Sequence, residues 1–183
     1  MIVAPTPEYI LGVDPGTIRM GYGLLEVRDN TPNYLTCGVL NGGASRALGD
    51  RLWKIYQGLT DVLRTWGPNV VAMEEAFIPN NSLSGGVGKG NIRSAIMVGQ
   101  AGALVLLAAA GMGLPTFTYT PAQVKSAVTS YGRSNKAQVQ EMVRLTLGLE
   151  LPPQPVDAAD ALAVALCYLN HRRQDSLIGA SIK

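Results

Sequence analysis

The chain has 183 residues, of which 47% are hydrophobic, with two cysteines and a formal net charge of +2 at pH 7. This length supports one domain with a sizeable core and excludes a second full domain. Cys37 and Cys167 lie far apart and match no metal-ligand spacing, which argues against structural zinc and indicates a reducing compartment. The N-terminus lacks the basic region and apolar run of a signal peptide, so we expect a cytoplasmic protein.

The first pattern in the chain is an apolar run that ends at Asp14 and then breaks at Pro15. Such a run predicts a buried strand that holds a carboxylate where the sheet meets solvent. Gly16, Gly21 and Gly23 are expected to keep bulk away from this carboxylate, so that a phosphate or a metal ion can approach. The alternative is that Asp14 only caps a hairpin turn, and this stretch alone leaves both readings open.

Further along the chain, apolar residues recur every two residues in some segments and nearly every four in others, as in strands and helices respectively. It predicts strands at 9–14, 21–27, 34–40, 69–73 and 115–119, a turn at 29–32, and helices at 48–63 (with a stop at Gly67), 91–111, 121–129, 135–147 and 157–169. This order predicts an α/β fold with a five-stranded mixed sheet flanked by helices on both faces. We expect one domain over residues 1–170 and a loose polar tail at 171–183.

Three more positions could bring carboxylates to Asp14. Glu74 and Glu75 end a predicted strand, and because neighbouring residues on a strand face opposite ways, only one of them can share a face with Asp14. Asp157 and Asp160 lie three apart at a helix start and therefore point to one side. For Asp157 a simple helix cap is an equal alternative. Asp160 has apolar neighbours, among which an unpaired carboxylate would be costly.

Together, these acids form an oxygen donor set of the kind that Mg²⁺ prefers, and two ions about 3.5–4 Å apart can drive in-line attack on a phosphodiester. The four candidate ligands are Asp14, Glu74, Asp157 and Asp160. Nucleophilic alternatives lack parts, since the single histidine, His171, is in the predicted tail and there is no Gly-x-Ser-x-Gly motif.

The middle of the chain is unevenly charged. Between residues 76 and 149 there are six basic residues and one acid, Glu141, which gives a segment charge of +5. The basic residues are Lys89, Arg93, Lys125, Arg133, Lys136 and Arg144. This asymmetry is compatible with a phosphate-backbone partner, although a solvated basic face is the usual alternative.

The glycine-rich segment 80–90 only superficially resembles a nucleotide-binding loop. Leu83 stands where the first glycine of a P-loop belongs, and Gly90 replaces the Ser or Thr that should follow Lys89. The charge-free run that follows, residues 94–124, is rich in Ala and Gly and falls short of about 20 strongly apolar residues. We therefore expect no membrane span here, but a helix buried at the centre of the domain, with one face available to a dimer.

Four segments, taken together, resemble the RuvC family of Holliday junction resolvases over residues 8–170: 10–23, 72–77, 123–125 and 157–163. The resemblance implies an RNase H-like fold and a homodimer. It also implies nicking of two opposed strands of a four-way DNA junction, dependent on Mg²⁺ or Mn²⁺, with two ions per active site. A branch-migration complex of the RuvA and RuvB kind is a further partner that such an enzyme can have.

The same resemblance assigns the site residues. Asp14, Glu74, Asp157 and Asp160 fall on the family's catalytic and metal-binding carboxylates, and Glu75 stands where many members have Gln. The expected DNA contacts are Phe77, near the strand-exchange point, and the basic residues Lys89, Arg93, Lys125 and Lys136. Core packing for Phe77 and a solvated face for the lysines are the alternatives. Between Phe77 and the next helix the chain carries a glycine-rich excess over the family's usual spacing.

Three rival functions remain to be weighed. An ATPase of the actin type shares the Asp-x-Gly-Thr pattern but needs two such domains, which 183 residues cannot hold. An RNase H-like nuclease acting on flaps, R-loops or phage-type branched DNA would carry the same carboxylates, so only its substrate distinguishes it. A catalytically silent junction-binding protein would lack one of the ligands, and none is missing.

Overall fold

The computed structural model describes residues 6–76, 89–129 and 134–181. Its centre is one five-stranded sheet with the order β3-β2-β1-β4-β5. The strands are β1 (Glu8–Asp14), β2 (Arg19–Arg28), β3 (Thr31–Asn41), β4 (Val70–Glu74) and β5 (Thr116–Tyr119). Strands β1, β2 and β3 pair antiparallel, whereas β4 pairs parallel with β1 and β5. The predicted mixed sheet is therefore confirmed.

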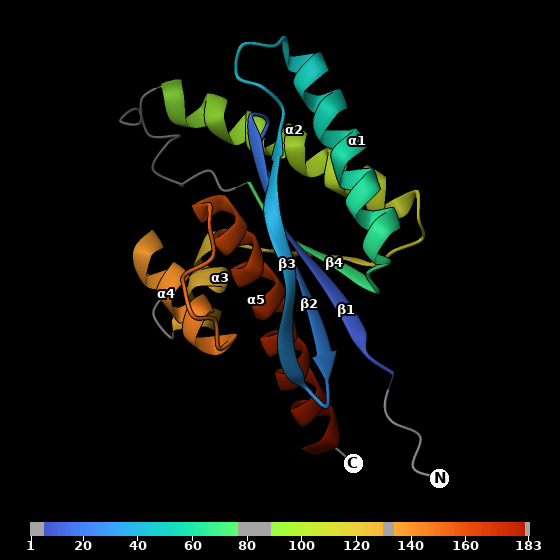
Figure 1. Ribbon diagram of the computed structural model, residues 1–183, viewed down its shortest axis with the longest axis vertical. Helices are drawn as coiled ribbons and strands as arrows, with labels where there is room; N and C mark the ends of the chain where they lie inside the picture. The colour runs from blue at the N-terminus through green and yellow to red at the C-terminus, as the bar shows by residue number, and fades with distance from the viewer. Residues whose placement is uncertain (1–5, 77–88, 130–133, 182–183) are drawn as a thin grey trace.

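Helices cover both faces of this sheet, as predicted (Figure 1). They are α1 (Leu48–Trp66), α2 (Lys89–Ala110), α3 (Pro121–Thr129), α4 (Lys136–Thr146) and α5 (Val156–Ser181). Helices α1 and α2 lie on one side of the sheet, and α5 lies on the other with α3 and α4 packed against it. Two separate hydrophobic cores follow from this arrangement, one on each face.

Alternation along β1 divides its side chains between the two cores. Ile10 belongs to the core under α5, and Leu11 and Val13 belong to the core under α1. Helix α1 supplies Ile55 and Leu59, which lie one helical turn apart and are both fully buried. Each such side chain contributes about 1.5–3 kcal/mol through burial, so both faces of the sheet are covered by strong apolar contacts.

The hairpin between β2 and β3 is tighter than the predicted turn at 29–32. Asp29 and Asn30 both have positive φ, 49° and 62°, and they form a two-residue connection. Asn and Asp tolerate this left-handed geometry better than most residues, and it matches the twist of the flanking strands. Thr31 and Pro32 therefore belong to β3 rather than to the turn.

The glycines near Asp14 have a different role from the one expected. A Cβ on Gly21 would overlap a backbone carbonyl in the first turn of α5, and one on Gly23 would press into Leu162. A Cβ on Gly16 would overlap the carbonyl of Arg19 inside the turn. The expectation that these glycines make room for a ligand is wrong, because the space beside Gly21 and Gly23 is filled by α5. They let this helix approach the sheet closely.

The C-terminal helix is longer than predicted. It continues past the expected end at 169 and past the expected domain boundary at 170, and it ends at Ser181. Arg172 pairs with Glu8 of β1, and the ring of His171 stacks on Tyr119 of β5 with centroids 5.1 Å apart. The prediction of a loose tail from 171 was wrong because these partners are distant in sequence and hold the helix against the sheet.

Helix α2 is not buried at the domain centre. Ala101 and Val105 are buried against the α1 core, whereas Ile96 and Leu107 are 55% and 67% exposed. Among the described residues, Ile92–Ala110 of α2 is the one helical stretch long and apolar enough to cross a membrane, and 33% of its apolar window is buried within the protein. A core helix passes the same test of length and composition, and α2 packs on α1 as well as on the sheet.

Candidate active site

Asp14 and Glu74 come to the same place because their strands are parallel neighbours. Val13 of β1 pairs with Met73 of β4, so the next residue on each strand reaches the same edge of the sheet. The side chains of Asp14 and Glu74 turn to the face covered by α5 and line one cavity there. Glu75 lies outside that cavity, which settles which of the two adjacent glutamates shares the face of Asp14.

Helix α5 brings the other two carboxylates to this edge. The helix begins at Val156, and its first turn lies directly against the glycine positions of β2. Asp160 lines the same cavity as Asp14, whereas Asp157 lies outside its lining. The charge of Asp157 is nevertheless felt at Asp14, where it raises the pKa of that carboxyl. Three predicted ligands therefore share one cavity, and the fourth lies outside its lining.

The cavity is small and partly basic. Its volume is about 150 Å³, and its lining includes Lys125 of α3 and Lys136 of α4 besides the three carboxylates. Lys136 Nζ donates a hydrogen bond of 2.7 Å to Asp160 Oδ2. Helix α4 begins immediately before this contact with a capping box, in which Asn135 and Gln138 bond each other's backbone N–H groups, so the position of Lys136 is well fixed.

Asp157 has a cationic partner of its own that the sequence analysis missed. Arg19 Nε lies 2.8 Å from Asp157 Oδ2. Arg19 is the first residue of β2, and the pairing of Asp14 with Gly21 brings this end of β2 beside the end of β1. The hairpin register could have placed Arg19 near the site, but its pairing with Asp157 depends on how α5 crosses the sheet.

Negative charge in the cavity exceeds what these cations neutralise at Asp14. The pKa of Asp14 is raised to about 7, first by burial and then by repulsion from Glu74 and Asp160, while Lys136 acts in the opposite direction. Burial and repulsion from Asp160 also raise the pKa of Glu74. The hydrogen bond to Asp160 raises the pKa of Lys136, which stays cationic at neutral pH. Perturbed carboxylates in a cleft are typical of functional sites.

The donor set fits a hard divalent cation in chemistry, because it consists of partly buried carboxylate oxygens with excess negative charge. In the described parts of the chain, no three side chains of His, Cys, Asp or Glu are grouped so that they could hold one ion as they lie. Asp160 is bonded to Lys136 and Asp157 to Arg19. A metal ion would therefore compete with these two cations for two of the four carboxylates.

The family model of crossover junction endodeoxyribonuclease RuvC matches residues 10–168 of this chain. The chain belongs to the RuvC family. It is 41% identical over 179 residues to crossover junction endodeoxyribonuclease RuvC of Rubrobacter xylanophilus, which covers 98% of this chain and 94% of that protein. It is 46% identical over 158 residues to that of Heliobacterium modesticaldum, with 86% and 91% covered.

Solved structures agree with the family assignment. Thermus thermophilus RuvC in complex with a Holliday junction substrate superposes with a TM-score of 0.78 at 31% identity, over 92% of this chain and 96% of that one. The yeast mitochondrial Holliday junction resolvase shares the fold, with a TM-score of 0.61 at 16% identity over 94% of this chain and 81% of that one. The RNase H-like architecture expected from the sequence is the architecture of the RuvC family and is confirmed.

The expected DNA contacts are distributed in three ways in this RuvC-family chain. Lys125 and Lys136 line the carboxylate cavity. Arg93 is exposed on α2, away from that lining. Phe77 lies outside the described residues, and so does the side chain of Lys89, the first residue of α2. The glycine-rich segment 80–90 is described only at its last two residues, where α2 begins.

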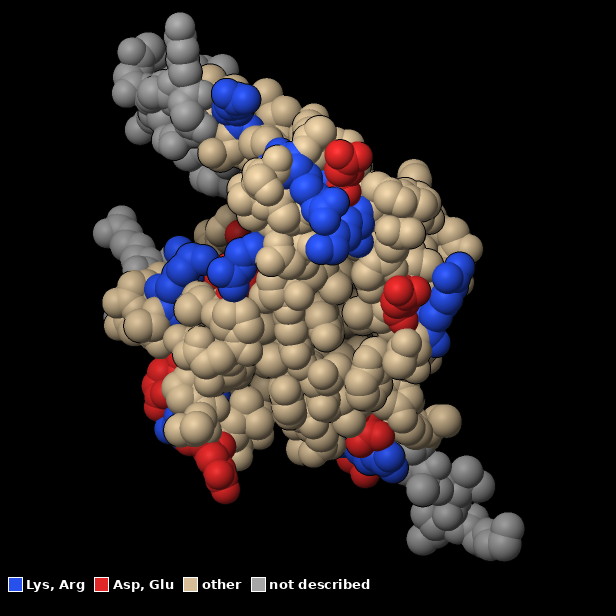
Figure 2. Space-filling model, turned by 45° about the horizontal axis from the view of Figure 1, so that its top comes forward, with Lys and Arg blue, Asp and Glu red and all other residues tan. Residues whose placement is uncertain are grey.

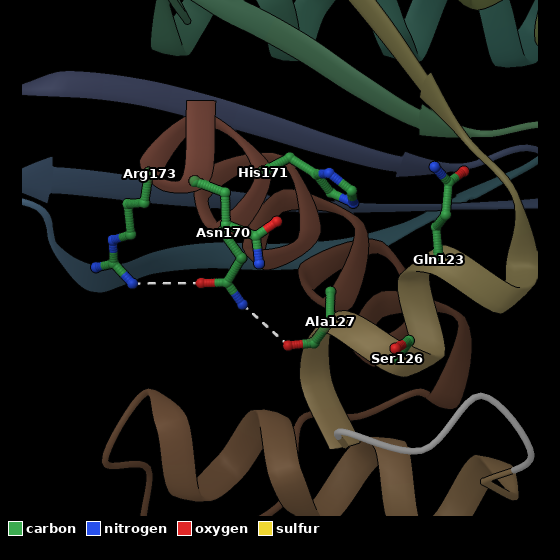
Figure 3. Close-up of a pocket in the computed structure, with 7 residues that line it drawn as sticks. Gln123, Ser126, Ala127, Asn170, His171 and Arg173 are labelled. Atoms are coloured by element: carbon green, nitrogen blue, oxygen red, sulfur yellow. Dashed lines mark hydrogen bonds between the residues drawn. The ribbon is translucent and has the colours of Figure 1, made fainter. Parts of the chain in front are cut away.

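A larger cavity of about 480 Å³ lies between α3 and the C-terminal half of α5 (Figure 3). Asn170 lines this cavity, where its side chain donates a hydrogen bond of 2.9 Å to the carbonyl of Ala127 and accepts one of 3.3 Å from Arg173. Its lining contains no carboxylate, so it cannot supply the ligands that a phosphodiester-cleaving metal site needs. The smaller carboxylate cavity is therefore the candidate active site despite its size.

Proposed function

We propose that this protein is a structure-selective endonuclease that resolves four-way DNA junctions by paired nicks in opposed strands. The observation that carries the proposal is the convergence of Asp14, Glu74 and Asp160 on one cavity, in a chain of the RuvC family. Two relatives bear the name crossover junction endodeoxyribonuclease, and a structure similar over nearly the whole chain holds a Holliday junction.

The cofactor of this activity is a divalent cation, Mg²⁺ or Mn²⁺, with two ions per active site. Asp14, Glu74, Asp157 and Asp160 would hold them. When bound, such ions activate a water molecule and stabilise the leaving oxygen of the phosphodiester. The raised pKa of Asp14 supports this assignment, because a cation at the cavity would relieve the repulsion that keeps that carboxyl partly protonated near pH 7.

The two lysines of the cavity act on the DNA strand and on the carboxylates. Lys136 remains charged at neutral pH and holds Asp160 in place. Lys125 is half-buried at the cavity wall, makes no ion pair in the described residues, and lowers the pKa of Glu74 by its charge. Both ammonium groups attract a backbone phosphate toward the carboxylates, and Arg93 extends the DNA contact along α2.

A homodimer would supply the two active sites that paired nicks require. Helix α2 offers an apolar face for it, with Ile96, Leu106 and Leu107 all at least 45% exposed on one helix. Burial of such a face between two copies is favourable, and a two-fold axis would relate the two cavities. We also propose a cytoplasmic location, which two free cysteines support, and a branch-migration complex of the RuvA and RuvB kind as a partner.

The substrate preference separates this function from its nearest rival, a nuclease for flaps, R-loops or phage-type branched DNA. The test is to incubate the protein in Mg²⁺ with an end-labelled mobile four-way junction, a flap and a linear duplex of matched sequence. Symmetric paired nicks in the junction, with ligatable ends, are the expected result. Equal cutting of all three substrates would contradict junction resolution and leave a less selective nuclease.

A further inference from the structure

Arg51 carries a buried donor without a partner, on the opposite face of the sheet from the carboxylate cavity. This residue of α1 is 8% exposed, and its Nε atom is buried with no hydrogen-bond acceptor. No hydrogen bond or ion pair within the described parts of the chain involves its guanidinium. Buried N–H donors are normally hydrogen-bonded, because leaving one without an acceptor costs about 1–3 kcal/mol. The isolation of Arg51 therefore points to an acceptor outside the chain.

The surroundings of Arg51 place it beside the turn that follows Asp14. A Cβ on Gly42 would lie 3.1 Å from Arg51 Cβ and 2.8 Å from the carbonyl oxygen of Thr17. Gly42 therefore contacts both the side chain of Arg51 and the backbone of Thr17. Arg51 lies in the first turn of α1, and long helical side chains lean toward the helix N-terminus. Its Cβ lies beside Gly42, in the connection between β3 and α1.

The same connection carries further groups that favour an anion. The N-cap residue of α1, Ala47, has no side chain that could bond the first-turn N–H groups. Arg46 is exposed and folds over Gly43, where a Cβ would lie 3.0 Å from Arg46 Nε. The one acid in the first turn of α1, Asp50, is exposed and forms no ion pair with Arg46 or Arg51. Two arginines and a helix N-terminus thus outweigh a single solvated carboxylate.

A chain of contacts links this region to the active site. Arg19, which pairs with Asp157, is the β-sheet partner of Asn41 in β3. Asn41 Oδ1 accepts a hydrogen bond of 2.9 Å from the N–H of Gly43. Several groups of basic side chains lie over the upper half of the face in Figure 2, where the top of the molecule comes forward. The carboxylate cavity and the region of Arg51 therefore lie along one edge of the sheet.

We propose that Arg51, with Arg46 and the N-terminus of α1, binds a phosphate group of the DNA backbone outside the cleaved position. A guanidinium fork matches two phosphate oxygens, and first-turn N–H groups are a common anion site. The site lies on the α1 face and is distinct from the lysines of the carboxylate cavity. Only the identification of the ligand as substrate DNA rests on the proposed function.

The test compares Arg51→Met with Arg64→Met, which makes the same substitution on the exposed far end of α1. Binding to a four-way junction and to a linear duplex is measured by anisotropy without metal, over a range of NaCl concentrations. Loss of one phosphate contact lowers the slope of log K against log salt by about 0.9. We expect this decrease for Arg51→Met on both DNAs and none for Arg64→Met. Equal slopes for the two variants overturn the proposal.

Two additional measurements keep the test decisive. Arg46→Met changes an exposed side chain, so if Arg51→Met does not fold, an unchanged slope for Arg46→Met overturns the proposal and a reduced one supports it. If the protein binds the junction no better than the duplex, the proposed junction selectivity fails, and the slope on duplex DNA still decides the role of Arg51.

Inorganic sulfate, added at constant ionic strength, distinguishes a site for free phosphate from a site for the DNA backbone. Greater thermal stabilisation of the unsubstituted protein than of Arg51→Met supports a general phosphate site, and equal stabilisation with a reduced slope supports a DNA-backbone site.

Discussion

The two faces of the sheet depart from electrical balance in opposite senses. On the α5 face, burial and then repulsion from neighbouring acids raise the pKa of Asp14 to about 7. On the α1 face, the Nε atom of Arg51 is buried with no hydrogen-bond acceptor. The first region thus holds an excess of acids over cations, and the second holds more basic than acidic side chains. The proposed metal cation and the proposed DNA phosphate would each supply the missing complement, so the free protein carries unfavourable charge at both proposed sites.

The largest expected effect tests the acidic region. Asp14→Asn keeps the shape of the side chain and removes its charge, so we expect cleavage of a four-way junction to fall by several orders of magnitude while junction binding stays largely intact. Single-turnover cleavage and binding without metal measure the two quantities. The matched control is Glu75→Gln, one residue beyond Glu74 and outside the cavity, which should cut at nearly the normal rate. Retained turnover in Asp14→Asn would remove Asp14 from the active site.

The next effect is the pH dependence of stability without metal. The ordinary pKa of Asp14 is 3.8 and the folded protein raises it to about 7, so the folded state binds the proton more tightly. Its contribution to the free energy of unfolding is therefore favourable at low pH, falls as pH rises from about 4 to 7, and is constant above that window. We expect Asp14→Asn to be more stable than the unsubstituted protein by about 4 kcal/mol at pH 8, and to lose this advantage near pH 4.

Urea unfolding of both proteins from pH 4 to pH 9, with a chelator present, measures this difference. A difference that does not change with pH would show that Asp14 has an ordinary pKa, and the account of charge crowding on the α5 face would be wrong.

A third effect concerns the close approach of α5 to the sheet. Gly21→Ala places a Cβ on a backbone carbonyl that cannot move without shifting the helix, so we expect a loss of about 1–3 kcal/mol in the free energy of unfolding, with reduced cleavage. Gly49→Ala is the control, because a Cβ there meets nothing within 4 Å and the position is helical. It should stabilise the protein by about 0.5–1 kcal/mol. Equal stabilities of the two variants would refute the packing role of Gly21.

The smallest effect distinguishes the DNA contacts of the two faces. Lys125→Ala should weaken junction binding and lower the salt slope by about 0.9, because one phosphate contact of the carboxylate cavity is lost. Arg64→Ala, on the opposite side of the sheet, is the control. An unchanged slope for Lys125→Ala would show that this lysine touches no phosphate, and the basic lining of the cavity would then act on the carboxylates alone.

Sequence patterns predicted the parts of this molecule that depend on local periodicity. Alternation on the strand indicated that only one of Glu74 and Glu75 could join Asp14, and the helix position of Asp160 brought it to the same cavity, although Asp157 lies outside the lining. The order of elements predicted the mixed sheet. These inferences worked because each depends on the geometry of a single strand or helix, which the hydrophobic pattern reveals.

The remaining features depend on how elements cross. The pairing of Arg19 with Asp157 and of Lys136 with Asp160 joins residues from different elements, and no local pattern signals it. Gly21 was misread because the helix that fills its space is more than 130 residues away in the chain. The full length of α5 was missed for the same reason, since Arg172 is held by Glu8 near the opposite end of the sequence.

The most direct test of the central claim is to locate manganese in crystals of the protein grown or soaked in Mn²⁺. An anomalous difference map identifies the ion independently of any assumption about its ligands. The account predicts a peak bounded by the carboxylates of Asp14, Glu74 and Asp160, with Lys136 Nζ displaced from Asp160. A map at saturating Mn²⁺ with no peak there, or with its strongest peak elsewhere on the protein, would contradict it.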